Sequence, residues 1–100
     1  MAYVVIARWL TTAGNADRVR QALEKLTGPS RAEPGSRAYQ PLQSLDDSRE
    51  FLIYEAYDDE AAYEAHGSSE HFRRYAVEEG IPLLESRERS YYRTLDGEAG

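Results

Sequence analysis

The chain has 100 residues and no cysteine, and its 18 acidic and 12 basic residues give a net charge of −6. That length fits one domain, and the missing cysteines exclude a disulfide scaffold and a thiol nucleophile. The acidic balance argues against a nucleic-acid partner. The opening segment MAYVVIARWL is apolar only briefly, so we expect neither a signal peptide nor a membrane span. We therefore expect the protein to be cytoplasmic.

The first half of the chain predicts a strand followed by a helix. Residues 3–10 are β-branched and aromatic with a single charge, which is typical of a strand covered on both faces. Asn15 occupies an N-cap position, and Gly28 with Pro29 predicts that the helix ends or kinks near residue 27, with a short helical extension through Arg31 to Glu33. Between them an apolar stripe recurs at helical spacing: Ala16, Val19, Ala22, Leu23 and Leu26.

Residues 37–45 and 50–57 predict a pair of strands joined as a hairpin. Alternation along the second strand places Phe51, Ile53, Glu55 and Tyr57 on one face. Glu55 is the only charge inside this apolar run. Because buried charges are normally paired, we expect Glu55 to form a salt bridge rather than to act as a base. Its candidate partners are Arg8, Arg31 and Arg89.

The second half predicts two helices and a last strand. A helix capped by Asp58 and Asp59 runs to about residue 66, with Ala61, Ala62 and Ala65 facing inward. A further helix follows over residues 70–79, with Phe72, Tyr75 and Ala76 facing the core. The last strand is expected over 86–95. We therefore expect a domain over 1–95 and a flexible tail over 96–100.

This order of elements predicts an α+β fold of the ferredoxin-like split βαβ type, a four-stranded antiparallel sheet with helices on one face. Helices cover only one face of such a sheet, whereas residues 3–10 and 50–57 are apolar on both faces. A second copy of the chain is the natural cover for the other face, so we expect a homodimer whose two sheets pack into a dimeric α/β barrel.

Three segments resemble the antibiotic biosynthesis monooxygenase family: PSRAEPGSRAY at 29–39, FLIYEAYDDEAAYEAH at 51–66 and SSEHFRRY at 68–75. The resemblance implies a dimeric α/β barrel and a cofactor-independent monooxygenase. Such an enzyme oxidises a hydroxylated aromatic, polyketide or quinol substrate with O2, and uses no metal, flavin or haem. The deprotonated substrate itself passes an electron to O2, so the protein need only bind, deprotonate and shield it.

The resemblance and the side-chain chemistry together predict site residues. The expected catalytic residues are His71, His66 and Tyr63, because a neutral imidazole is a natural general base near pH 7. His71 is preferred because it shares a helix face with Tyr75. The five-residue spacing of the histidines does not suit a helical metal pair, so no metal is expected. The expected substrate-binding residues are Tyr57, Ile53, Trp9, Phe72 and Tyr75, and Ile53 replaces an asparagine of the polyketide-oxidising members.

Arg87, Arg89 and Arg93 alternate on the last strand with Tyr91 on the same face, where they could bind an anionic substrate or brace a dimer. Bracing is the preferred interpretation. Two other functions remain open. One is an isomerase of a small phosphorylated ketone, which an arginine cluster at the pocket mouth would favour. The other is a non-catalytic dimer that binds a small molecule, which a pocket filled by tyrosine and leucine would favour.

Overall fold

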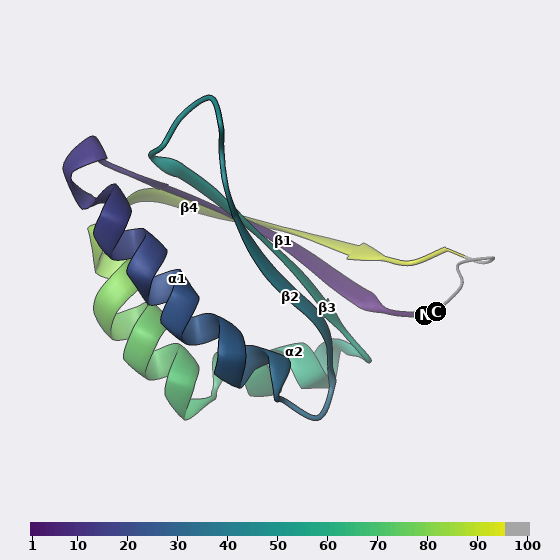
Figure 1. Ribbon diagram of the computed structural model, residues 1–100. Coiled ribbons are helices and arrows are strands. Elements are labelled where there is room, and N and C mark those ends of the chain that lie inside the picture. Colours follow the sequence, from purple (N-terminus) through teal and green to yellow (C-terminus); the bar gives the residue numbers. More distant parts are fainter. Residues whose placement is uncertain (96–100) are drawn as a thin grey trace.

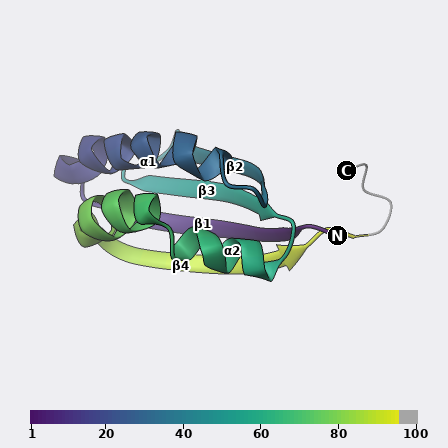
Figure 2. The same ribbon diagram turned by 90° about the horizontal axis from the view of Figure 1, so that it is seen from below.

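The computed structural model describes residues 1–95 as a four-stranded antiparallel sheet with helices on one face (Figures 1 and 2). The main elements are β1 (Tyr3–Thr11), α1 (Ala16–Arg31), β2 (Ser36–Gln43), β3 (Glu50–Tyr57), α2 (Glu60–Gly67), the π-helix η2 (Phe72–Gly80) and β4 (Leu84–Arg93). The strand order is β2-β3-β1-β4. This confirms the ferredoxin-like α+β fold. The tail predicted over 96–100 lies outside the described residues.

The sheet has an inner face under the helices and an outer face without them (Figure 2). In the register of β1, Ala7 lies opposite Ile53 on β3 and Arg89 on β4, so these residues share the inner face. The inner positions of β1 are buried from Val5 to Thr11, whereas the alternate outer positions from Ile6 onward are only partly covered. The expectation that β1 is covered on both faces is therefore not met within one chain.

Helix α1 packs through the apolar stripe that its spacing predicts, and Val19, Leu23 and Leu26 are buried. The helix does not end near residue 27 but continues through Pro29 to Arg31, so the predicted helical extension is confirmed up to Arg31 and stops before Glu33. Proline removes one helical hydrogen bond, but tertiary contacts hold the last turn. Ser30 is buried, and Arg31 Nε donates to the carbonyl of Tyr39 on β2 at 2.9 Å.

Helix α2 packs against the sheet through His66, whose side chain is larger than those of its alanines. Asp59 caps it by accepting from the Ala62 N–H at 2.9 Å. The predicted inward orientation is wrong for Ala61 and Ala65, which are exposed, while His66 is buried. The imidazole buries more surface against the sheet than a methyl group does, and this decides which way the helix turns. The next helical segment is also not a regular α-helix but the π-helix η2, a form often found at functional sites.

The approach of α2 to the start of β2 generates a stability prediction. A Cβ atom added at Gly35 would lie 2.5 Å from Ala62 Cβ. Gly35→Ala should therefore destabilise the fold by about 1–3 kcal/mol through overpacking. Gly28→Ala is the matched control, because nothing lies within 4 Å of its Cβ position. Alanine is the better helix former there. Urea unfolding of both variants checks this, and a Gly35→Ala protein as stable as the wild type would contradict the close approach.

Candidate functional site

A cavity of about 180 Å³ lies between the inner face of the sheet, α2 and the start of η2. Five of the eight predicted site residues line it: Trp9, Ile53, Tyr63, His66 and Phe72. Three charged or titratable residues join them: Glu55, Arg87 and Arg89. The cavity therefore combines aromatic walls with groups able to move a proton or bind a charge.

The other three predicted residues do not line this cavity. Tyr57 is fully buried behind the lining, where its hydroxyl contacts Glu55 and its ring packs against Tyr63 and His66. His71 contacts Glu33 instead. Tyr75 packs against the hydrophobic core away from the cavity, with Arg74 over its ring. His66, not the preferred His71, is thus the histidine in contact with the cavity. The catalytic roles themselves stay predictions.

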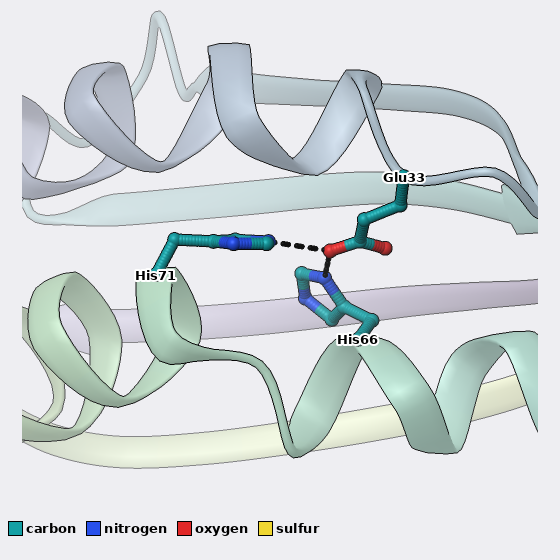
Figure 3. A group of neighbouring side chains, drawn as sticks. All are labelled: Glu33, His66 and His71. Carbon is teal, nitrogen blue, oxygen red and sulfur yellow. Dashed lines mark hydrogen bonds and ion pairs between the residues drawn. The ribbon is translucent and has the colours of Figure 1, made fainter.

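Glu33 brings the two histidines together (Figure 3). It lies in the turn between α1 and β2, and its Oε2 atom accepts from His66 Nδ1 at 2.7 Å and from His71 Nε2 at 2.5 Å. An ionised carboxylate only accepts hydrogen bonds, so both of these nitrogens carry protons. A neutral His66 is then left with an unprotonated Nε2. Ser69 holds the bend between the histidines by donating to the His66 carbonyl at 2.6 Å.

Sequence reasoning missed Glu33, because a glutamate in an Arg-Ala-Glu-Pro-Gly turn carries no local signal of function. Donor atoms of Glu33, His66 and His71 lie within 4.8 Å of one another, and two imidazoles with one carboxylate form a donor set that Zn²⁺ or Fe²⁺ accepts. The observed separations are hydrogen-bond lengths. A tetrahedral ion bound at about 2.0–2.1 Å would require the donor atoms to move to about 3.3 Å apart.

The salt bridge predicted for Glu55 is wrong. The strand register places Arg8 opposite Leu52 on the outer face, where Arg8 pairs with Glu50 at 2.9 Å. The other two candidate partners bind neutral groups: Arg31 the Tyr39 carbonyl, and Arg89 the Tyr63 hydroxyl, both at 2.9 Å. Whether an arginine pairs with Glu55 therefore depends on the face of the sheet on which it lies and on how far its side chain extends, and not on charge alone.

Glu55 is instead held by Tyr57 and lies near His66. The Tyr57 hydroxyl donates to Glu55 Oε1 at 2.6 Å, and His66 Nε2 is 3.9 Å from the same oxygen. Burial raises the pKa of Glu55 to about 7, against the opposing effect of the Tyr57 hydrogen bond. Burial also lowers the pKa of His66, against the opposing effect of Glu33. The cavity therefore contains a carboxyl group that titrates near neutral pH beside an imidazole whose neutral form is favoured.

Tyr63 lines the cavity and packs against two tyrosines that lie outside the lining. The Tyr63 ring lies 5.5 Å from that of Tyr57 and 5.7 Å from that of Tyr3, measured between centroids. Burial, and then the neighbouring Tyr91, raise the pKa of Tyr63 to about 12. The Tyr63 phenol consequently remains protonated at neutral pH and is a potential donor rather than a base.

The fold and its cavity define a ferredoxin-like α+β protein with a small polar and aromatic site between sheet and helix. Residues 2–78 match the family model described as antibiotic biosynthesis monooxygenase, and the chain belongs to that family. In no described helix is there an apolar stretch long enough to cross a membrane.

Similar proteins agree with this assignment. Rv0793 of Mycobacterium tuberculosis, for which a monooxygenase activity has been suggested, is 32% identical over 76 residues, which cover 76% of this chain and 74% of that protein. Its solved structure superposes with a TM-score of 0.88 at 28% identity over 99% of this chain and 100% of that one. PA3566 of Pseudomonas aeruginosa superposes with a TM-score of 0.87 at 32% identity over 94% of each chain.

The buried carboxylate generates a pH-dependence prediction. The pKa of Glu55 is about 7 in the folded protein and about 4.5 in the unfolded chain. Between these pH values the folded protein binds a proton that the unfolded chain does not, so the free energy of unfolding falls as the pH rises through this range. Glu55→Gln removes this loss. From pH 4.5 to pH 8 its free energy of unfolding should rise relative to wild type by roughly 3 kcal/mol. Urea unfolding across this range measures it, with Glu64→Gln on the exposed face of α2 as control. Parallel profiles for wild type and Glu55→Gln would contradict the prediction.

Proposed function

We propose that the protein is a cofactor-independent monooxygenase that oxidises a hydroxylated aromatic compound or quinol with O2. The observation that carries the proposal is the position of His66. Glu33 holds its Nδ1–H, and its Nε2 is left beside Glu55 in an aromatic cavity. This is the arrangement of a general base whose tautomer is set by a carboxylate on the far side of the ring. Membership of the family supports the oxygenase chemistry.

In this mechanism the substrate supplies the electrons. His66 Nε2 accepts the proton of a ring hydroxyl, with Glu55 able to share it. The resulting phenolate transfers one electron to O2, and the radical pair combines to form a carbon–oxygen bond. The oxygen–oxygen bond then breaks, the leaving oxygen takes its protons back through His66, and water departs. A hydroquinone and O2 thus become a hydroxyquinone and water. The aromatic lining and a bound substrate together limit the access of bulk solvent to the reactive intermediate.

The size of the cavity narrows the substrate. A cavity of about 150 Å³ holds one benzene ring, and the volume here is about 180 Å³. One substituted ring therefore fits, whereas a fused polyketide does not fit without movement of α2 or η2. Ile53 also offers no polar contact at the base of the cavity. We accordingly favour a single-ring quinol over a polyketide.

The activity prediction is O2 consumption by protein dialysed against a chelator, assayed on a panel of hydroquinones. His66→Gln should lower kcat by about 10²–10⁴-fold, which is the usual contribution of a general base. Tyr63→Phe removes a hydroxyl from the cavity and should lower the rate less, while Arg18→Gln on the exposed side of α1 is a control outside the cavity and should leave the rate unchanged. His71→Ala spares the His66–Glu33 contact and should cost less than His66→Gln. Activity that requires added metal or flavin would overturn the mechanism.

We also propose that the protein is a homodimer through the outer face of its sheet. Large apolar side chains are exposed there: Leu42 at 49%, Tyr54 at 39% and Tyr92 at 56%. The register places all three on the side opposite the helices. Face-to-face packing of two sheets would bury them.

Analytical ultracentrifugation tests the dimer. The wild type should sediment as a dimer, and Tyr54→Glu should shift it to a monomer because two carboxylates would be buried at the two-fold interface. Arg18→Glu, a charge change on the exposed side of α1, is the control and should remain dimeric. A monomeric wild type at micromolar concentration would contradict this interface.

A second candidate function is the isomerisation of a small phosphorylated ketone. The proximity of Glu55 and His66 favours it, because such a reaction needs one proton removed and another returned. An assay under argon separates the two candidates. Conversion of the ketone without O2 would favour the isomerase, and conversion of a hydroquinone only with O2 would favour the oxygenase.

A further inference from the structure

Two N–H groups around the cavity have no protein partner. Arg87 Nε and Trp9 Nε1 are both buried, and neither makes a hydrogen bond to another residue of the described chain. Both residues line the same cavity. Trp9 itself is only 2% exposed, so bulk water does not readily satisfy its indole N–H. An unpaired buried donor is costly, and two of them at one cavity indicate a ligand that brings acceptor oxygens.

The charge around these donors is also uncompensated. The protein carries six more acidic than basic residues, and arginines such as Arg8 and Arg49 pair with carboxylates. Within residues 1–95, however, Arg87 and Arg89 form no ion pair within 4 Å. Arg89 donates only to the neutral Tyr63 hydroxyl. Two adjacent guanidinium groups thus face a cavity in a chain that has carboxylates to spare.

Glu55 attracts both arginines across the cavity but forms no ion pair with either of them. Its own pKa of about 7 leaves it partly protonated at neutral pH, and its Oε1 already accepts from Tyr57. Burial, and then repulsion from Arg89, lower the pKa of Arg87, but a guanidinium remains protonated at neutral pH. The register favours anion binding over the dimer-bracing role preferred for these arginines, because the cavity and the proposed dimer surface lie on opposite faces of the sheet. Arg87 lies opposite Trp9, and both point to the inner face of the sheet.

We propose that the substrate carries an anionic oxygen group, a carboxylate or its equivalent, which Arg87 and Arg89 bind together with Trp9 Nε1. Phe72 supports this site, because the Arg87 guanidinium lies 5.9 Å from the centre of its ring. The substrate hydroxyl is then directed to Glu55 and His66. The substrate class is a single-ring aromatic with a hydroxyl at one position and an anion at another. This inference rests on the proposed function for the hydroxyl, and on the cavity alone for the anion.

The test is binding under anaerobic conditions, so that no oxidation occurs. The probes are 2,5-dihydroxybenzoate, hydroquinone and inorganic phosphate, followed by the fluorescence of Trp9, the single tryptophan. The carboxylated ring should bind at least about 10-fold more tightly than hydroquinone, because a desolvated charge pair adds 1.4 kcal/mol or more. Arg87→Gln should remove that preference and leave hydroquinone binding unchanged. Arg93→Gln, exposed on the same strand and outside the cavity, should keep it.

Each outcome decides a separate point. Equal affinity for the two rings, or equal losses for both in Arg87→Gln, would overturn the anion site. Tight phosphate binding that depends on Arg87 would support the anion site and assign the group to phosphate, as the isomerase candidate requires. Binding of the carboxylated ring through Arg87 without O2 consumption in air would defeat the proposed oxidation and leave the anion site standing. Urea unfolding of Arg87→Gln confirms that the variant is folded.

Discussion

The site depends on one constraint, the burial of a carboxylate on the inner face of a sheet strand. Glu55 is 5% exposed, and no arginine or lysine of residues 1–95 forms an ion pair with it, so it is stable there only with a donated hydrogen bond and a readily bound proton. Tyr57 supplies the hydrogen bond from two residues along the same face. The carboxyl group consequently titrates near neutral pH. Its pKa is therefore close to the value at which proton transfer is most effective.

The helices complete this site by bringing groups from distant parts of the chain. Helix α2 turns His66 toward Glu55, and the turn after α1 places Glu33 behind the imidazole (Figure 3). The carboxylate of Glu33 thus contacts one nitrogen of the His66 ring, and His66 itself lines the cavity. Strand β4 contributes Arg87 and Arg89 to the same cavity, and within residues 1–95 neither forms an ion pair. The cavity thus combines groups that exchange a proton with the two guanidinium groups to which we assign the anion of the substrate.

Much of the fold could be predicted from local patterns. Alternation along β3 correctly placed Ile53, Glu55 and Tyr57 on one face, and helical spacing identified the buried stripe of α1. The errors concern contacts between distant segments. The Glu33–His66 hydrogen bond joins residues 33 positions apart, and no local pattern encodes it. Likewise Arg8 was a reasonable partner for Glu55 by charge, and only the strand register shows that it lies on the other face.

The central claim is that His66 offers an unprotonated Nε2 to the cavity because Glu33 holds the proton on Nδ1. Long-range proton–nitrogen NMR of the imidazole groups tests it directly at pH 7.5, with His66→Gln used to assign the signals. The account predicts a neutral His66 ring with a protonated Nδ1 and an unprotonated Nε2, and a loss of that preference in Glu33→Gln. A proton on Nε2, or the same tautomer populations in wild type and Glu33→Gln, would contradict it.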